Sequence, residues 1–326
     1  ARPRIGIHDG RSPPALAVAG TRTVFFGTPD WAVPSLEAVL ASDLDVVAVV
    51  TNPDRPAGRG MKLAHSPVKS VALKAGVRVE QPASAKDPGF ADTLHELAPD
   101  VAAVVAYGKI LPRAILDVPP HGFVNLHFSL LPEYRGAAPV QRAVMEGKET
   151  TGASTMLLTE GMDEGPVLAS IEVDIAGDES AGALGQRLAV LGAPLLVDSV
   201  SGYVGGSIEP QPQDDSLATY APKITEQEAR IGWDRGFEDL SCFVRGLDPA
   251  PGAWTKLGDR RLRVFRLARA DTPDLVPGGV EAGKELLVGC GDATAVIVEA
   301  QLEGKRRMSG RDIAHGLRLT PGDRFE

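Results

Sequence analysis

Two polar side chains stand two positions apart in an apolar segment of the sequence that ends Asn125-Leu126-His127. On a β-strand, residues two apart point to the same face, so Asn125 and His127 project together while Leu126 points to the opposite face. An amide that donates a hydrogen bond can polarise a carbonyl group, and an imidazole beside it can hold or move a proton. The pair therefore indicates attack on a carbonyl by a nucleophile that belongs to the substrate. A strand-end pair that only closes a turn explains these two residues equally well.

A carboxylate that could join this pair lies on a loop between two glycines, Gly161 and Gly165. From there Asp163 could orient the imidazole of His127 and stabilise its protonated form. An Asp between glycines is more often a plain turn former. Only proximity to Asn125 and His127 favours the functional interpretation.

Cationic residues gather in two other regions. The segment Thr51–Lys74 holds five Lys or Arg against one Asp, follows an expected strand and is punctuated by Gly and Pro, which suits contact with a phosphate backbone. The segment Lys256–Arg269 holds six Lys or Arg against one Asp. The chain has a net charge of −9, and residues 222–326 carry none of it. On charge alone, a solvated surface is the simpler interpretation of these cationic runs.

Short apolar runs alternate with helical patterns in the first two thirds of the chain. This alternation predicts a doubly wound, mostly parallel Rossmann-like α/β sheet, which binds ligands at the carboxyl ends of its strands. The first turn, Gly27-Thr28-Pro29, lacks the G-x-G-x-x-G fingerprint of dinucleotide binding and predicts a helix capped by Thr28. The expected strands are Thr23–Phe26, Asp45–Val50, Val77–Val79, Val101–Val105 and Val124–His127, and helices are expected to end near Leu97 and to span Pro139–Met145.

A length of 326 residues predicts two domains. We expect an extension outside the core at residues 1–20, a catalytic domain at 21–203, a linker rich in Gly, Ser and Pro at 204–222, and a C-terminal domain at 223–326. Alternating segments and Gly-bearing turns in the C-terminal domain predict a small β-barrel of OB-like type. This architecture often binds nucleic acid.

The composition excludes several classes of protein. Hydrophobic residues make up 43% of the chain, which argues against disorder, and 36 Gly with 26 Pro argue against a helical bundle. No apolar run approaches the roughly 18 residues of a membrane span. Two cysteines cannot build a disulfide framework or a four-cysteine zinc site. We therefore expect a cytoplasmic protein without a membrane span.

Several motifs together resemble the methionyl-tRNA formyltransferase family. The Asn-x-His, SLLP and Asp pattern is similar to folate-dependent formyltransferases in general, whereas the PDRPAGRG and RGAAP motifs are closer to the tRNA-dependent branch. The resemblance extends from Thr23 to Glu326 and departs at Phe128, where many relatives have a small residue. The motifs are Val24-Phe25-Phe26-Gly27-Thr28-Pro29, Pro53-Asp54-Arg55-Pro56-Ala57-Gly58-Arg59-Gly60, Val105-Ala106-Tyr107-Gly108, Asn125-Leu126-His127, Ser129-Leu130-Leu131-Pro132, Arg135-Gly136-Ala137-Ala138-Pro139 and the Asp163 loop.

The resemblance implies that Asn125, His127 and Asp163 are catalytic. They would transfer a formyl group from 10-formyltetrahydrofolate to the α-amine of methionyl initiator tRNA, in preparation for translation initiation, without a metal. We expect a monomer. The implied folate contacts are Tyr107, Gly108, Ile110, Leu111, Ser129, Leu130, Leu131 and Pro132. The expected tRNA contacts are Arg55, Arg59, Lys62, Lys69, Arg260, Arg261, Arg263, Lys305, Arg306 and Arg307.

Three other functions share parts of this pattern. A sugar-nucleotide N-formyltransferase would use the same donor and catalytic residues without a basic loop or an RNA-binding domain. A formyltetrahydrofolate hydrolase would use water in place of the amine and release formate. An RNA-binding protein on an inactive enzyme scaffold would bind RNA without turnover, which the three intact catalytic positions disfavour.

Overall fold

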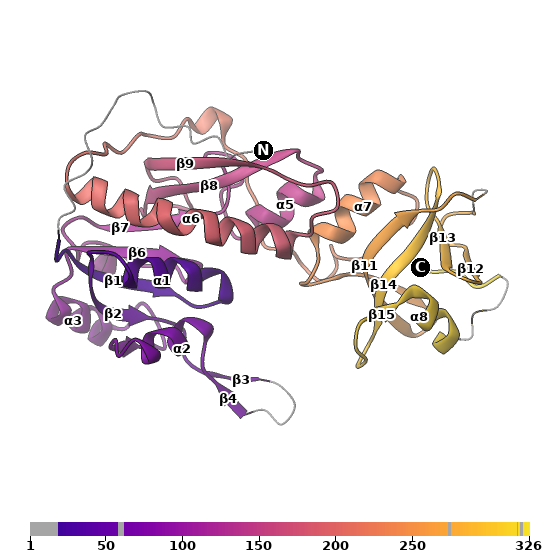
Figure 1. The fold of residues 1–326 in the computed structure, drawn as a ribbon, viewed down its shortest axis with the longest axis horizontal. Helices are drawn as coiled ribbons and strands as arrows, with labels where there is room; N and C mark the ends of the chain where they lie inside the picture. The colour runs from indigo at the N-terminus through magenta and orange to yellow at the C-terminus, as the bar shows by residue number, and fades with distance from the viewer. Residues whose placement is uncertain (1–18, 58–61, 273–274, 318, 320–321) are drawn as a thin grey trace. The chain divides into compact units, whose positions relative to one another are not determined.

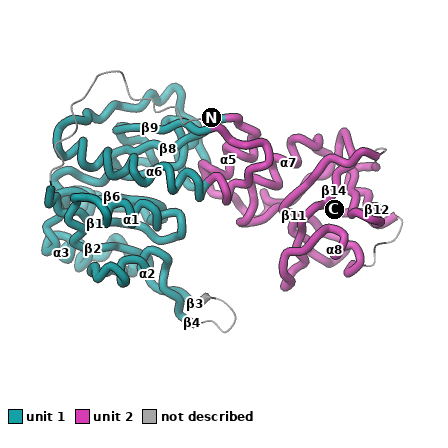
Figure 2. The backbone as a smooth tube through the Cα atoms, viewed as in Figure 1, with its two compact units in different colours: residues 1–137, 150–173, 185–221 teal, residues 138–149, 174–184, 222–326 magenta. Residues whose placement is uncertain are grey.

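The computed structural model describes residues 19–57, 62–272, 275–317, 319 and 322–326. The chain forms two compact units (Figure 2). Unit 1 comprises residues 1–137, 150–173 and 185–221, and unit 2 comprises residues 138–149, 174–184 and 222–326. Of the expected extension at residues 1–20, all but the last two residues lie outside the described part of the chain.

A seven-stranded sheet forms the body of unit 1, with the strand order β5-β2-β1-β6-β7-β8-β9 (Figure 1). The pairs β1–β2, β1–β6, β2–β5 and β6–β7 are parallel, whereas β7 and β8 are antiparallel. The predicted mostly parallel α/β sheet is therefore confirmed, and β8 and β9 are additions that the sequence patterns missed. The strands are β1 (Arg22–Gly27), β2 (Asp45–Val50), β5 (Val79–Glu80), β6 (Val101–Val105), β7 (Phe123–His127), β8 (Thr150–Leu157) and β9 (Val167–Asp174).

On one face of this sheet, α3 (Pro88–Leu97) and α4 (Arg113–Leu116) cover a core of alternate strand residues. The ring of Phe26 packs edge-on against Phe90, Tyr107 and Phe123, with centroid distances of 6.3, 5.3 and 5.2 Å. Phe26 and Phe123 belong to β1 and β7, and Tyr107 lies two residues beyond the end of β6. Their burial therefore holds the strands that carry the candidate site next to one another.

The opposite face of the sheet packs against α6 (Ala181–Val204). A Cβ atom added at Gly192 of α6 would lie 2.8 Å from the Leu126 side chain, and one at Gly185 would lie 2.1 Å from the ring of Trp31. Among the helices of the described residues, α6 alone is long and apolar enough to cross a membrane. Half of its apolar window is buried, however, as in the core helix of a folded domain.

The turn after β1 differs from the prediction. Thr28 does not cap a helix: η1 (Asp30–Ala32) starts after Pro29, and α1 (Val33–Leu40) starts after Ala32 without a side-chain cap. The Thr28 hydroxyl instead accepts a hydrogen bond of 2.9 Å from the side-chain amide of Asn52, beyond β2. The Thr28 hydroxyl therefore bonds to Asn52, which follows the neighbouring strand β2, in place of a backbone N–H group at the start of a helix.

The predicted basic loop contains a short hairpin. Strands β3 (Arg55–Ala57) and β4 (Lys62–Ala64) pair antiparallel, project from the α/β body of unit 1 (Figure 1) and lead into α2 (Pro67–Lys74). Of residues 204–222, predicted as a linker, Val204 ends α6 and the segment that follows belongs to unit 1 up to Ala221. In this segment Gln211 pairs with Val167, and η2 (Asp215–Leu217) precedes a pairing of Tyr220 with Arg135.

Unit 2 contains an antiparallel sheet of order β10-β11-β14-β13-β12, with β15 paired to β14. Its last residues bridge the two edge strands, because the backbone N–H of Glu326 bonds to Lys256 of β10 and that of Phe325 bonds to Gly278 before β12. The predicted C-terminal β-barrel is thus confirmed as an antiparallel half-barrel. Its elements are α5 (Pro139–Met145), α7 (Phe237–Gly246), β10 (Ala253–Leu257), β11 (Arg260–Arg269), β12 (Val280–Ala282), β13 (Leu286–Gly289), β14 (Thr294–Leu302), β15 (Met308–Ser309) and α8 (Gly310–Leu317).

Candidate active site

His127 ends β7 with both ring nitrogens facing oxygen atoms. Its Nε2 lies 2.9 Å from the carbonyl oxygen of Tyr134, and its Nδ1 lies 3.7 Å from Oδ2 of Asp163. A carbonyl oxygen only accepts hydrogen bonds, so Nε2 carries the hydrogen and Nδ1 keeps its lone pair when the ring is neutral. The distance of 3.7 Å is too long for a hydrogen bond but short enough for an ion pair once Nδ1 is protonated. The geometry therefore leaves Nδ1 as the nitrogen that can exchange a proton.

The Asp163 carboxylate is held in place by the backbone of Gly136, whose N–H donates a hydrogen bond of 2.8 Å to Oδ2. Gly136 has a φ of +117°, and a Cβ atom there would lie only 2.9 Å from the carbonyl oxygen of Ala221. No other residue fits this position without strain. The fold thus brings Asp163 and His127 together from segments 36 residues apart.

Asn125 lies on the same face of β7 as His127, and both side chains are more than nine-tenths buried. Within the described part of the chain, the side-chain amide of Asn125 makes no hydrogen bond. The amide atoms remain accessible to solvent, so the N–H group of Asn125 can donate to a ligand oxygen. Phe128, where the sequence departs from many relatives, turns to the other face and packs edge-on against Trp31 at 5.8 Å.

The ends of three parallel strands are tied together beside β7. The Asn52 side-chain amide donates to the Thr28 hydroxyl and to the carbonyl oxygen of Tyr107, both at 2.9 Å. The Tyr107 ring itself lies in the core, where burial raises the pKa of its hydroxyl to about 12. Tyr107, a predicted folate contact, therefore presents its backbone to this edge of the sheet and its ring to the core.

Two other predicted folate contacts lie in the open just after β6. Gly108 has a φ of +75°, and a Cβ atom added there would have no other atom within 4 Å, while Ile110 is 78% exposed. Leu111 is buried in the core that α3 and α4 cover. Of these three predicted folate contacts, Gly108 and Ile110 are thus accessible and Leu111 is part of the core.

The Ser129–Pro132 turn follows His127. The buried Ser129 hydroxyl donates to the carbonyl oxygen of Glu133 at 2.6 Å, and the backbone N–H of Leu131 donates to the Ser154 hydroxyl at 3.1 Å. Leu130 and Pro132 are partly buried in the same turn. Ser129 therefore shapes the turn, while Leu130, Leu131 and Pro132 retain accessible surface.

The predicted tRNA contacts in and next to the β3–β4 hairpin differ in their exposure and in their ion pairs. Arg55 is exposed on β3, Lys62 lies on β4, and Arg59 lies outside the described residues. Lys69 instead pairs with Asp54 at 2.7 Å and is 14% exposed. Hydrogen bonds from Lys69 and then Gln81 lower the pKa of Asp54 to about 2. Lys69 thus anchors the base of the hairpin.

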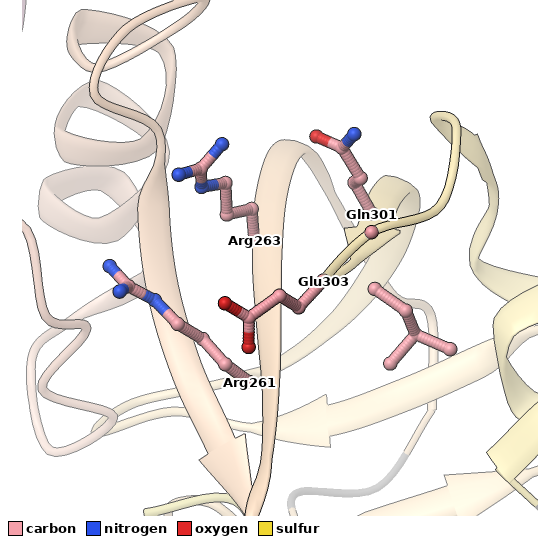
Figure 3. A pocket seen from close by; sticks show the side chains of 6 residues that line it. Arg261, Arg263, Gln301 and Glu303 are labelled. Atoms are coloured by element: carbon pink, nitrogen blue, oxygen red, sulfur yellow. The ribbon is translucent and has the colours of Figure 1, made fainter. Parts of the chain in front are cut away.

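In unit 2, two predicted tRNA contacts line a hollow of about 140 Å³ on the outer face of the half-barrel (Figure 3). Arg261 and Arg263 share this face because they are two apart on β11, and Gln301 and Glu303 complete the lining with Leu302 and Gly304. Arg261 also stacks on the Trp254 ring, with its guanidinium carbon 4.3 Å from the centroid. Its guanidinium also pairs with Glu226, so in this hollow the exposed Arg263 is the arginine suited to contact with nucleic acid.

The remaining predicted cations of unit 2 fall into two groups. Arg260, Lys305 and Arg306 are exposed. Arg307 is engaged within unit 2, where it pairs with Asp248 and its guanidinium lies over the Phe265 ring at 3.4 Å. Arg307 therefore stabilises the half-barrel itself.

Of the residues that hold the site together, the sequence motifs include Gly136 but not Tyr134, Gln213 or Thr219. Tyr134 and Gly136 act through backbone atoms, and Gln213 and Thr219 come from the predicted linker. The Arg-Gly pair at 135–136 was a signal for Gly136. Nothing in the sequence marks the other three residues.

The part of the chain that the structure describes contains no group of His, Cys, Asp and Glu suited to a metal, and no dinucleotide fingerprint.

The chain matches the family described as Formyl transferase over residues 21–200, and the one described as Formyl transferase, C-terminal domain, over residues 223–318. The chain and its fold are thus those of a formyltransferase with a C-terminal domain.

Comparison with individual proteins shows to which family of formyltransferases the chain belongs. A methionyl-tRNA formyltransferase of Streptomyces coelicolor is 47% identical over 306 residues, which cover 93% of this chain and 99% of that protein. The chain belongs to the methionyl-tRNA formyltransferase family.

Solved structures share the fold at lower identity. Methionyl-tRNA formyltransferase from Clostridium thermocellum aligns with a TM-score of 0.56 and 17% identity, covering 78% of this chain and 95% of that one. HypX from Aquifex aeolicus in complex with tetrahydrofolic acid aligns with a TM-score of 0.63 and 15% identity, covering 92% of this chain and 48% of that one.

Proposed function

We propose that the protein is a monomeric cytoplasmic enzyme that transfers the formyl group of 10-formyltetrahydrofolate to the α-amine of methionine on initiator tRNA. Relatives at 41–47% identity over 93% of the chain are methionyl-tRNA formyltransferases, which supports this reaction. The observation that carries the proposal is the Asn125 amide at the end of β7, which has no hydrogen-bond partner among the described residues and stands beside the His127–Asp163 pair.

The accessible strand end next to Asn125 supports folate binding there. Asn125 is paired in register with Val104 of β6, and β6 leads directly to the open backbone of Gly108 and the exposed Ile110. The co-substrate supplies the formyl group, and transfer forms a C–N bond to methionine as the C–N bond to folate breaks. Asn125 would then donate a hydrogen bond to the formyl oxygen as negative charge grows there.

His127 would manage the proton of the attacking amine. Its Nδ1 takes up that proton while Nε2–H stays bonded to Tyr134, and Asp163 stabilises the resulting imidazolium. The proton then passes to the folate nitrogen that loses the formyl group. The exposed Arg55 of the hairpin and the exposed Arg260 and Arg263 of β11 would contact the phosphate backbone of the tRNA.

A formyl-transfer assay with three acceptors tests the proposal. Purified protein and 10-formyltetrahydrofolate are incubated with charged initiator tRNA, charged elongator methionine tRNA or an amino-sugar nucleotide. We expect a formylated product with initiator tRNA only. Transfer to the amino sugar, release of formate without an acceptor, or tRNA binding without transfer would each replace the proposal with one of the three other functions.

The Asn125→Ala variant tests the site in the same assay. It should lower kcat by about 10²–10³-fold, the usual effect of losing one oxyanion donor. The control is Gln211→Ala, because Gln211 is an exposed amide that bonds only to the backbone of Glu209 through its side chain. A parental rate for Asn125→Ala would contradict the assignment of Asn125.

A further inference from the structure

The segment at residues 205–222 lies between the two family matches and packs along unit 1. Its Gln211 exchanges two backbone hydrogen bonds of 2.8 Å with Val167 of β9. Farther along, the backbone N–H of Arg135 donates to Thr219 and that of Ala221 donates to Arg135, at 2.9 and 2.7 Å. The backbone of this segment is therefore anchored on both sides of the Asp163 loop.

The side-chain amide of Gln213 bonds to the backbone of the Asp163 loop. Its Nε2 donates to the carbonyl oxygens of Asp163 and Gly165, at 2.9 and 2.6 Å. Its Oε1 accepts a hydrogen bond of 2.9 Å from Nε of Arg135, a side chain that is almost fully buried. Both N–H groups and the oxygen of the amide are thus engaged in one arrangement, which fixes the orientation of the amide.

The loop needs such support because Asp163 has a φ of +52°. A residue with a Cβ atom is uncommon in this left-handed region, and the surrounding contacts must hold it there. Gln213 bonds the backbone of Asp163 while Gly136 bonds its carboxylate.

The other partner of His127 is held from the same segment. The Thr219 hydroxyl accepts a hydrogen bond of 2.8 Å from the backbone N–H of Tyr134, and the Tyr134 carbonyl accepts one from Nε2 of His127. Gln213 thus holds Asp163, one partner of His127, and Thr219 holds Tyr134, the other partner.

We propose that Gln213 and Thr219 are positioning residues for formyl transfer, which act by holding Asp163 and Tyr134 against His127. This inference rests on the proposed function. It assigns residues 205–222 a part in the chemical step, in addition to connecting the two family-matched regions. Because the two residues do not face the reacting atoms, they should affect kcat and leave the KM values for tRNA and folate nearly unchanged.

The Gln213→Ala variant should lower kcat by about 10- to 100-fold, since small displacements of catalytic groups are costly. Each KM should stay within about 2-fold of the parental value. Gln211→Ala, which removes an exposed amide from the same segment, should keep the parental kcat. A rise in the KM for tRNA with an unchanged kcat would overturn the inference, because the segment would then act in binding.

A double-mutant cycle distinguishes positioning from general weakening of the fold. In the Asp163→Asn background, Gln213→Ala should cause little further loss of kcat, because both changes act on one interaction. Losses that multiply would overturn the inference. A parental rate for Asp163→Asn alone would instead remove the catalytic assignment of Asp163 under the proposed function.

Thr219→Val keeps the test decisive if Gln213→Ala does not fold. Thr219 is exposed, and valine has the same branched shape without the hydroxyl that accepts the Tyr134 bond. We expect a folded protein, by thermal denaturation, with kcat lowered about 10-fold and unchanged KM values. A parental kcat in the folded Thr219→Val variant would overturn the inference for Tyr134.

Discussion

The imidazole of His127 and the backbone carbonyl of Tyr134 form a hydrogen bond of 2.9 Å that decides which ring nitrogen carries the proton. Tyr134 has a φ of +57°, so the direction of its carbonyl depends on the structure around it. With Nε2 committed to this bond, Nδ1, which faces Asp163, is the nitrogen that would take up a proton under the proposed mechanism. The charge of Asp163 is then the property that the first prediction tests.

Asp163→Asn should lower kcat for formyl transfer by about 10²-fold or more. The variant keeps an oxygen that can accept the Gly136 N–H bond but loses the charge that stabilises protonated His127. Because the Gly136 hydrogen bond is kept, the free energy of unfolding should change by less than about 1 kcal/mol. Single-turnover kinetics and urea denaturation measure the two effects. The control is Asp92→Asn on the exposed face of α3, and a parental kcat for Asp163→Asn would show that the charge is not needed.

Gly136→Ala should destabilise the protein by about 1–3 kcal/mol, because the residue has a positive φ and the added carbon would press on the Ala221 carbonyl. It should also lower kcat, since Gly136 must move away from Asp163. The control is Gly76→Ala, which has a φ of +70° but no atom within 4 Å of its added carbon. Equal losses of stability in the two variants would show that backbone strain alone, and not the close approach to Ala221, explains the glycine.

The fold was predictable where burial leaves a simple pattern in the sequence. Strand β6 is fully buried and β2 is buried over its last three residues, and the two contain the continuous apolar runs Val101–Val105 and Val46–Val50. Strand β8 reads TTGASTML, with few large apolar residues, and was missed although most of it is buried. Its small polar side chains are satisfied by partners such as Ser129 and Ser199, which only the folded chain brings near.

The candidate site was predictable in part. The period of two in a strand places Asn125 beside His127, and resemblance to a family adds Asp163. Gln213 and Thr219 lie 50 and 85 residues from the backbone groups that they hold. Because those groups are a carbonyl and an N–H that any residue supplies, no side-chain pattern reveals the contacts.

Asp54 should make the stability of the protein depend on pH in the acid range. Its pKa is lowered from 3.8 to about 2, chiefly by the hydrogen bond from Lys69 and then by Gln81. Asp54 therefore stabilises the folded state above about pH 4, and this contribution is lost as the pH falls toward about 2. Urea unfolding across this range should show a shallower pH dependence for Asp54→Asn. Lys69→Met should flatten the dependence as well, and an unchanged slope in both variants would exclude this ion pair as its source.

Arg263→Gln should weaken binding of initiator tRNA and make that binding less sensitive to salt. Arg263 is exposed in the hollow on β11, and no ion pair engages it within the described chain. Loss of one phosphate contact reduces the slope of log K against log salt by about 0.7–0.9. Titrations of labelled tRNA over a salt series measure the slope. Arg113→Gln serves as the control, because Arg113 is an exposed cation of unit 1 that pairs with Asp117. If the slope for Arg263→Gln equals that of the parental protein and of the control, Arg263 makes no phosphate contact and the hollow is not part of the tRNA-binding surface.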